Sequence, residues 1–245
     1  MTSVFRSLST YCMNKQLYSL RTNYILPLHK SLLVSTVSIS ERISPYSKKI
    51  KCWKCGIERQ NINELFCQKC NIIQYPEVKN NYFKILHCNE SFDIDFKELR
   101  GRYRHMQNIL HPDKFSNSVE EKHISEGFSS LVNKAYDILR SPLKRAEHLL
   151  CLKGEIIKED IKIEDPDYLM QIMDLNEEVE RASPEELIKL NRLNLENMNN
   201  IQQEISEGFK KNDLKKVKYS IIKLRYYNSL SLHINNLLRE RGLVD

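Results

Sequence analysis

The chain has 245 residues, of which 41% are hydrophobic and 29% charged, a composition typical of globular proteins. Its 6 Gly and 7 Pro favour long uninterrupted elements, and no apolar run reaches the roughly 18 residues that a membrane span needs. Four of the basic residues behind the formal charge of +6 lie in the first 40 positions, which hold no acidic residue. The rest is close to neutral, which argues against a dedicated nucleic-acid binder.

Residues 1–45 are predicted to be a targeting segment. Arg and Lys are dispersed among many Ser and Thr, and the first acidic residue is Glu41. Leu17, Leu20 and Tyr24 can form a modest apolar face. These features are typical of a mitochondrial transit peptide, with cleavage expected between residues 30 and 50. A plastid address has similar chemistry and a tail without function is a further alternative, whereas the lack of an apolar core disfavours a secretory signal.

Two Cys-x-x-Cys pairs occur within residues 50–74, with eleven residues between them: Cys52 and Cys55, then Cys67 and Cys70. A turn holds the two thiolates of each pair together, and two turns complete the tetrahedron that Zn²⁺ prefers, with sulfur ligands at about 2.3 Å. Gly56 follows the second ligand, where the backbone needs a positive φ. We therefore predict a small zinc-knuckle domain with one structural zinc ion, which supplies the folding energy of so short a segment.

Other interpretations of the cysteines stay open. Four thiolates also suit iron. A redox motif is disfavoured by the presence of two pairs without a βαβ setting, and it would need an accessible thiolate of low pKa. Disulfides are disfavoured in a reducing compartment, and an odd count of seven cysteines does not suggest a secreted disulfide framework. A nucleic-acid role is favoured only by nearby basic and aromatic residues, namely Lys51, Trp53, Lys54, Arg59 and Lys69.

Two amphipathic helices are predicted on either side of His111-Pro112-Asp113-Lys114. Apolar residues recur at steps of three and four before it (Phe96, Leu99, Tyr103, Met106, Leu110) and after it (Ile124, Phe128, Leu131, Ala135, Ile138, Leu139). Pro112 cannot continue the first helix, because its ring clashes with the preceding turn and it lacks an N–H. The tetrapeptide is therefore a loop between two helices that pack as an antiparallel pair. A short helix is expected at residues 82–86, and Asp93 or Asp95 can cap the next.

The helix before the loop carries a basic cluster, Arg100, Arg102, Arg104 and His105. With this setting, residues 81–139 resemble a J-domain of the DnaJ-type co-chaperones. In that family the His-Pro-Asp loop and the basic face of the preceding helix engage a DnaK-class chaperone and stimulate its ATP hydrolysis. The resemblance implies that His111, Pro112, Asp113, Arg100 and Arg104 contact such a chaperone.

A further helix is predicted from Ser141-Pro142 to Gly154, with Leu143, Ala146, Leu149 and Leu150 facing inward. The sequence from Ser141 to Leu150 resembles the HscB-type J-proteins of iron–sulfur cluster biogenesis, and a tetracysteine domain before the J-domain is the animal form of that family. The resemblance implies that the J-domain with this extension helix, residues 80–154, leads into a C-terminal helical bundle in an L-shaped molecule.

Residues 160–245 are predicted to form a three-helix bundle. The helix starts are marked by Asp165-Pro166, by the capping box that begins at Ser183, and by Asn212-Asp213. Short connections make neighbouring helices antiparallel. The predicted fold class is therefore all-α: a J-domain helical hairpin and a C-terminal three-helix bundle, preceded by the zinc knuckle. The chain shows no nucleophile–base constellation or phosphate loop, so nothing in it suggests an enzyme. The resemblance implies that it activates the ATPase of a partner instead.

Two clusters in the bundle resemble the face with which HscB-type proteins bind the iron–sulfur cluster scaffold protein: Leu169, Met170, Met173, Asp174 and Glu177 on the first helix, and Arg225 and Tyr226 on the last. The alternative is that Leu169, Met173 and Tyr226 fill the core. At three positions this chain departs from bacterial members, which often have Leu at Met173, Glu at Asp174 and Phe at Tyr226.

Taken together, the resemblance implies a co-chaperone of the mitochondrial matrix, with an additional cytosolic pool left open. Its bundle would bind the scaffold protein, and its loop would trigger ATP hydrolysis by a mitochondrial DnaK-class chaperone and so promote cluster transfer. A general J-protein chaperone for unfolded clients is the alternative. Neither nucleic acid nor a membrane is expected as a partner, and a homodimer is left open.

Overall fold

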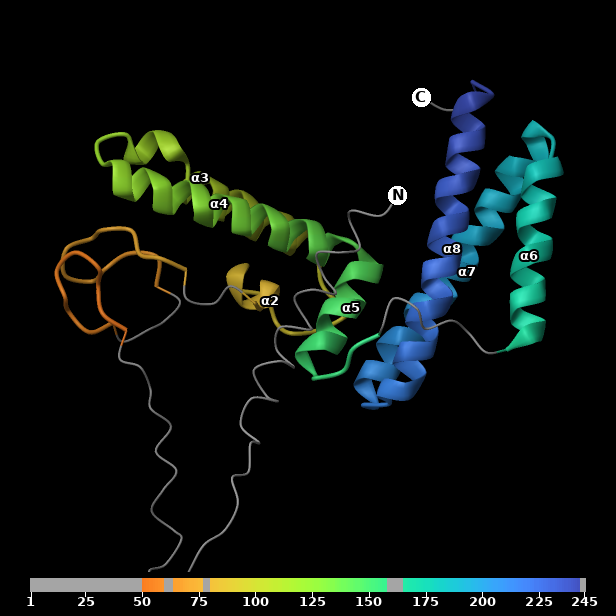
Figure 1. Ribbon diagram of the computed structural model, residues 1–245, viewed down its shortest axis with the longest axis horizontal. Helices are drawn as coiled ribbons and strands as arrows, with labels where there is room; N and C mark the ends of the chain where they lie inside the picture. The colour runs from red at the N-terminus through yellow and green to blue at the C-terminus, as the bar shows by residue number, and fades with distance from the viewer. Residues whose placement is uncertain (1–49, 60–63, 77–79, 158–164, 243–245) are drawn as a thin grey trace, which may run out of the picture. The chain divides into compact units, whose positions relative to one another are not determined.

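The computed structural model describes residues 50–59, 64–76, 80–157 and 165–242, so the expected targeting segment lies outside the described residues. The helices, labelled as in Figure 1, are α2 (Tyr82–Ile85), α3 (Phe96–Ile109), the 3-10 helix η3 (Pro112–Phe115), α4 (Val119–Arg140), α5 (Pro142–Leu152), α6 (Pro166–Arg181), α7 (Pro184–Lys210) and α8 (Leu214–Glu240). Apart from these, the described residues form only two isolated β-bridges. The all-α prediction is confirmed. Among the described residues, no helix combines the length and the hydrophobicity of a membrane span.

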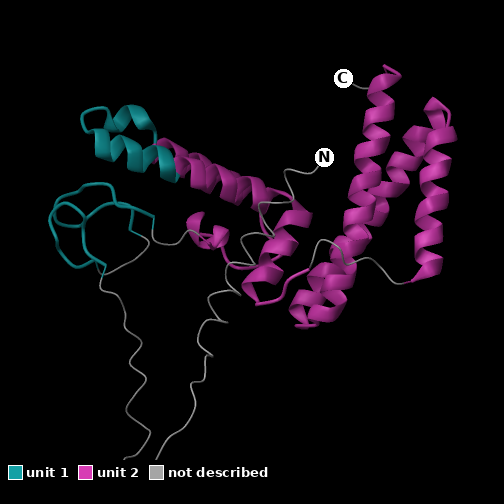
Figure 2. Cartoon of the chain, viewed as in Figure 1, with its two compact units in different colours: residues 1–78, 111–128 teal, residues 79–110, 129–245 magenta. Residues whose placement is uncertain are grey.

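The chain divides into two compact units (Figure 2). The first comprises residues 1–78 and 111–128, and the second comprises residues 79–110 and 129–245. The tetracysteine segment thus belongs to the same unit as the His-Pro-Asp loop and the first half of α4. No feature of the sequence predicted this grouping.

In the second unit, α3 and the later part of α4 run antiparallel, as predicted. The rings of Tyr103 and Tyr136 stack with 4.2 Å between centroids, and Gln107 Nε2 donates a 2.7 Å hydrogen bond to Asn133 Oδ1. The later residue of α3, Gln107, contacts the earlier residue of α4, Asn133, so the two helices run in opposite directions. Asp95 caps α3 by accepting from the N–H groups of Lys97 and Glu98.

The apolar stripe predicted for α3 faces the core, except at one residue. Leu99, Met106 and Leu110 are buried, but Phe96, which the periodicity placed in the core, is 51% exposed. Its ring lies 5.2 Å from the Arg145 guanidinium. Phe96 is the first residue of the helix. The periodicity rule assumes that the core covers the apolar stripe from the first turn onward, but the core does not cover this first residue.

Helix α5 ties together the segments that precede α3. His148 is buried, and its Nε2 accepts a 3.2 Å hydrogen bond from the Tyr82 N–H. Arg145 is also buried, and it donates to the carbonyl oxygens of Phe92 and Leu139 at 2.8 and 2.6 Å. Helix α5 ends at Leu152, and Gly154 just beyond it has a positive φ of 85°, in agreement with the helix stop predicted at this glycine.

Helices α6, α7 and α8 form the C-terminal bundle (Figure 1). Each begins at its predicted cap: Asp165, the capping box of Ser183 with Glu186, and Asp213. A cluster of seven buried residues forms a core at the far end of the bundle: Val179, Ala182, Leu187, Leu190, Leu230, Ile234 and Leu238. Near the turn between α7 and α8, a Cβ at Gly208 would lie 2.7 Å from Val217 Cγ2, so only glycine permits this close approach.

Two polar contacts join the bundle to the preceding helices within the second unit. Glu147 on α5 pairs with Arg225 on α8 at 2.7 Å. Asp93, before α3, pairs with Lys210 at 2.7 Å and accepts a 2.7 Å hydrogen bond from Ser206 on α7. These bonds hold the pKa of Asp93 below its usual range. Asp93 is therefore not the helix cap that the sequence allowed but a contact to α7.

Candidate functional site

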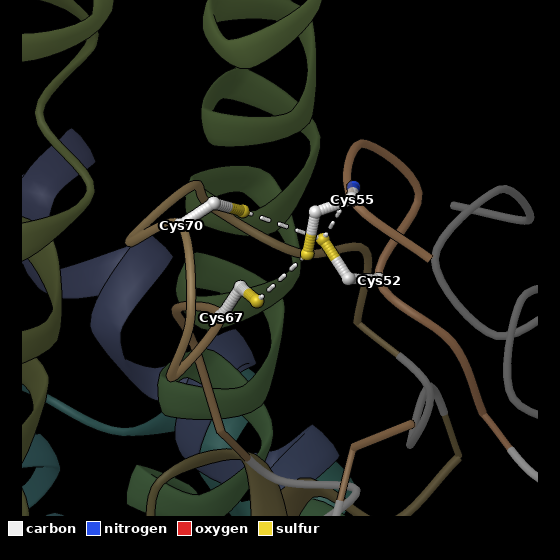
Figure 3. A group of neighbouring side chains, drawn as sticks. All are labelled: Cys52, Cys55, Cys67 and Cys70. Carbon is white, nitrogen blue, oxygen red and sulfur yellow. Dashed lines mark hydrogen bonds between the residues drawn. The ribbon is translucent and has the colours of Figure 1, made fainter. Parts of the chain in front are cut away.

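The four cysteines of the paired motifs come together in the first unit (Figure 3). Cys52 and Cys70 lie 3.6 Å apart between sulfurs, and Cys55 and Cys67 lie 3.7 Å apart. All four sulfurs lie within 4.8 Å of one another. A regular tetrahedron with metal–sulfur bonds of about 2.3 Å has edges of about 3.8 Å. The group therefore fits a tetrahedral metal ion, and the predicted clustering is confirmed.

Two turns of the same design present these cysteines. In the first, the Cys52 N–H donates to the Ile57 carbonyl at 2.9 Å, and the Gly56 N–H donates back to the Cys52 carbonyl at 3.0 Å. In the second, Cys67, Ile72 and Asn71 make the equivalent bonds at 2.9 and 2.8 Å. The residue after each second cysteine has a positive φ, 73° at Gly56 and 52° at Asn71. The positive φ predicted at Gly56 is confirmed, and asparagine fills the equivalent position because it tolerates this region better than most residues.

Hydrogen bonds lower the pKa of two of the four thiols. Burial opposes ionisation of Cys52, but backbone hydrogen bonds outweigh it and lower the pKa of this thiol to about 6. Backbone hydrogen bonding around Cys70 lowers the pKa of Cys67 in the same way. Burial raises the pKa of Cys70 to about 12, so this thiol needs a cation beside it to become a thiolate. Gln74 Nε2 lies 3.4 Å from Cys52 Sγ as a further donor to the sulfur.

The His-Pro-Asp loop is solvent-exposed. His111 has an extended backbone, and Pro112 begins η3, so the segment predicted as a plain loop contains one turn of 3-10 helix. The side chains of His111 and Asp113 are 58% and 88% exposed, with 3.4 Å between Nδ1 and Oδ2. The Lys114 N–H donates to the His111 carbonyl at 3.0 Å. The loop therefore offers an imidazole and a carboxylate to a partner.

The basic cluster of α3 divides into two kinds of residue. Arg102 forms an ion pair with Glu98 at 2.6 Å and donates to the His87 carbonyl. Arg100 and Arg104 are exposed, and among the described residues neither makes a hydrogen bond or an ion pair. They lie one turn apart on one side of the helix. Arg102 thus fastens the segment before α3, while Arg100 and Arg104 face solvent.

The first cluster of the bundle lies on the surface of α6. Met170 and Met173 are 66% and 64% exposed, Asp174 and Glu177 are exposed, and Leu169 is half-buried. The core on this helix is supplied by Ile172 and Val179. The alternative that Met173 fills the core is therefore wrong, and an exposed apolar and acidic surface remains.

The second cluster is more buried than the first. Arg225 is occupied by its ion pair with Glu147. The half-buried Tyr226 packs edge-on against Tyr168 of α6, with 6.3 Å between ring centroids. Lys223 lies over the rings of Tyr168 and Tyr219, at 5.2 and 4.7 Å from their centroids. Sequence reasoning missed both Glu147 and this aromatic group, because their partners are distant in the chain.

Comparison with known proteins agrees with this architecture. The family model of the DnaJ domain matches residues 81–148, and that of the HSCB C-terminal oligomerisation domain matches residues 164–235. The chain is 34% identical over 209 residues to the mouse (Mus musculus) protein named iron-sulfur cluster co-chaperone protein HscB, over 83% of this chain and 87% of that protein. The human (Homo sapiens) protein of the same name is 35% identical over 185 residues, 74% of this chain and 79% of its own length.

The fold is shared as well. The crystal structure of human co-chaperone protein HscB superposes with a TM-score of 0.71 at 33% identity, over 76% of this chain and 97% of that chain. The chaperone HscB from Vibrio cholerae has the same fold, with a TM-score of 0.59 at 24% identity. With helices in the expected order, an exposed His-Pro-Asp loop and relatives of this identity and coverage, the chain belongs to the HscB family of J-domain co-chaperones.

Proposed function

We propose that this chain delivers an iron–sulfur cluster scaffold protein to a DnaK-class chaperone and stimulates that chaperone's ATP hydrolysis. The observation that carries the proposal is the exposure of His111 and Asp113 in a loop within the region matched by the DnaJ model. A J-domain implies a DnaK-class partner, and the mouse and human relatives are named for iron–sulfur clusters. The chain then acts as a regulator: ATP is bound and hydrolysed by the partner.

The chemistry of the loop supports this role. A J-protein can accelerate hydrolysis only if it binds the reactive state of the chaperone more tightly than the resting state. Asp113 supplies an exposed negative charge, and His111 a donor and acceptor within 3.4 Å of it. Arg100 and Arg104 would meet an acidic surface of the chaperone, steering the encounter and setting its orientation. Pro112 fixes the direction in which the loop leaves α3.

The surface of α6 is the proposed contact to the scaffold protein. Met170 and Met173 provide a flexible apolar contact, which Leu169 extends. Asp174 and Glu177 flank it and suit a partner with basic side chains. Tyr226 would border this surface from α8, and Arg225 would act indirectly by holding α8 against α5.

Cys52, Cys55, Cys67 and Cys70 would hold one structural Zn²⁺. Zinc suits four sulfur ligands in a closed tetrahedral site, and no ligand position is left over for chemistry. Iron remains the competing ion. We place the protein in the mitochondrial matrix, on the composition of residues 1–45. The proposed parts of the chain are the transit peptide at 1–45, the zinc domain at 50–74, the J-domain with its extension at 80–154 and the bundle at 160–245.

The test measures the ATPase rate of a purified mitochondrial DnaK-class chaperone in four reactions: alone, with this protein, with an iron–sulfur scaffold protein, and with both. We expect the rate with both to exceed the product of the separate effects. Asp113→Asn should abolish stimulation while scaffold binding survives, because it removes an exposed charge and no packing. Stimulation that ignores the scaffold but follows a denatured model protein would favour the general J-protein alternative.

A further inference from the structure

Phe66 of the tetracysteine segment and Tyr75, the residue directly after that segment, each make a contact near the His-Pro-Asp loop within the first unit. The rings of Phe66 and Phe115 stack with 6.5 Å between centroids and 19° between planes. The Tyr75 hydroxyl donates a hydrogen bond to the Glu120 carboxylate, which raises the pKa of Tyr75. Residues 45 or more positions apart in the sequence are thereby joined. One partner of each contact lies within residues 66–75, and the other lies at the end of η3 or at the start of α4.

Each contact is directly adjacent to the metal centre. Phe66 precedes the ligand Cys67, and its backbone forms a β-bridge with Ile73. Tyr75 follows Gln74, a buried residue whose side chain lies 3.4 Å from Cys52 Sγ. A short segment of this kind owes its folded shape to the metal. Phe66 and Tyr75 will therefore hold their positions only while the four sulfurs are held together.

On the other side, the two contacts lie just beyond the loop. Phe115 is the last residue of η3, next to Lys114, which donates to the His111 carbonyl. Glu120 lies in the first turn of α4. None of the four residues of η3, all of them described, is buried. A segment with so little burial has low local stability, so contacts from outside the loop decide how well it is ordered.

We propose that the metal-binding segment is a brace for the His-Pro-Asp loop, with Phe66 and Tyr75 as positioning residues for chaperone stimulation. The metal then sets how effectively the protein engages its chaperone, and its loss weakens stimulation without touching His111 or Asp113. This inference rests on the proposed function and deepens it, because it assigns a regulatory role to a site that otherwise only stabilises its own segment.

The expected size follows from the contacts. An aromatic pair shifts an opening equilibrium by about two- to tenfold beyond the area it buries. A loop that is ordered for a smaller fraction of the time binds its partner with an affinity reduced by that fraction. Phe66→Ala should therefore raise the concentration of this protein needed for half-maximal ATPase stimulation by about two- to tenfold. Maximal stimulation should stay near the wild-type value, because a bound loop is intact.

The experiment uses the full chain and three measurements on each variant: zinc content, hydrogen exchange of the amides of residues 113–121, and chaperone ATPase as a function of concentration. Phe66→Ala and Tyr75→Phe should both speed exchange in this segment and shift the ATPase curve. Phe66→Tyr, which keeps the ring, should behave as wild type. Ile57→Ala changes a 40% exposed residue of the first cysteine turn and is the matched control, with no expected effect.

Removal of zinc from the wild type with a chelator should speed hydrogen exchange in residues 113–121 and raise the half-maximal concentration at least as much as Phe66→Ala does. The brace is overturned if zinc-loaded Phe66→Ala and Tyr75→Phe exchange and stimulate like wild type. Asp113→Asn separates the two proposals, because it should abolish maximal stimulation without changing hydrogen exchange at the brace. If the wild type itself fails to stimulate the chaperone, the proposed function is wrong, and hydrogen exchange alone still decides whether the brace exists.

Discussion

Glu147 on α5 and Arg225 on α8 form an ion pair in which Glu147 Oε1 lies 2.7 Å from Nη2 and 2.8 Å from Nε of Arg225. The two side chains are only 14% and 22% exposed. Burial raises the pKa of Glu147 even though Arg225 opposes that shift. The carboxylate is therefore stabilised mainly by the Arg225 guanidinium, with a weaker attraction from Lys144. The pair fastens the bundle to α5.

Arg225→Ala should lower the free energy of unfolding by about 2 kcal/mol, because it leaves a largely buried carboxylate without its cation. Urea unfolding monitored by circular dichroism measures the change. Arg181→Ala is the matched control, since Arg181 pairs with Glu177 where the side chains are 80% and 61% exposed, and it should cost less than about 0.5 kcal/mol. Equal losses in the two variants would show that burial of the Glu147 pair is irrelevant.

His148 should make the protein sensitive to mild acid. Burial lowers its pKa to about 4, whereas an unfolded histidine titrates near 6.5, so the unfolded chain binds more protons between these values. Stability is then full above about pH 6.5 and falls as the pH drops toward 4, by about 2 kcal/mol between pH 7 and pH 5. Urea unfolding at both pH values measures this difference.

His148→Gln isolates that contribution from the other groups that titrate in the same range, the cysteine thiols included. Glutamine keeps a hydrogen-bond acceptor for the Tyr82 N–H but does not titrate. The variant should lose about 2 kcal/mol of the pH dependence relative to wild type. An unchanged pH dependence in His148→Gln would mean that this buried imidazole is not the acid-sensitive group.

Local rules predicted the helix boundaries well. The caps Asp95, Asp165, Ser183 and Asp213 are found where the sequence placed them, because a capping side chain bonds to an N–H only two or three residues away. The four cysteines could be predicted for a similar reason: the spacing of each pair is itself the geometry of a turn. Helix caps and cysteine turns, which depend only on residues a few positions apart, could therefore be predicted from the sequence.

Burial and contacts that depend on residues distant in the chain could not be predicted from the sequence. The periodicity could not show that Phe96 lies partly exposed over Arg145, or that Val132 is fully buried while Leu131 is only half-buried. The partners of Arg225 and Phe66 lie far away in the chain. Such pairs depend on how the segments of the chain pack against one another, and the periodicity of a single sequence does not predict that packing.

The four clustered cysteines give a prediction that needs no partner protein. Cys52→Ser should lose the bound metal, because a structural site with three sulfurs no longer closes the tetrahedron. Cys88→Ser is the matched control, since Cys88 is half-buried but lies outside the group of four. Metal content by plasma mass spectrometry on protein purified under reducing conditions measures the loss.

The identity of the ion is settled in the same experiment. Zinc-loaded protein should be colourless, and replacement by Co²⁺ should give the visible absorption of a tetrahedral thiolate site. Iron in the freshly purified protein would contradict the zinc assignment while leaving the four ligands in place. Retention of the metal by Cys52→Ser would contradict the ligand set itself.

The exposed surface of α6 should contribute to binding and hardly to folding. Met170 and Met173 are 66% and 64% exposed, so changing both to serine removes little packing. The free energy of unfolding should fall by about 1 kcal/mol at most, the cost of serine in a helix. Affinity for a purified iron–sulfur scaffold protein should fall about tenfold or more, if the two side chains lie at the centre of the contact.

A matched double variant makes this loss interpretable. Ile188 and Leu195 on α7 are 53% and 48% exposed and lie seven residues apart on one side of their helix. Changing both to serine alters a similar apolar area on another helix, and scaffold affinity measured by calorimetry should stay at the wild-type value. A similar loss in both doubles would indicate a non-specific effect of surface polarity. A drop of several kcal/mol in the stability of Met170→Ser/Met173→Ser would instead show that these methionines support the fold, because side chains that are about two-thirds exposed contribute little to folding.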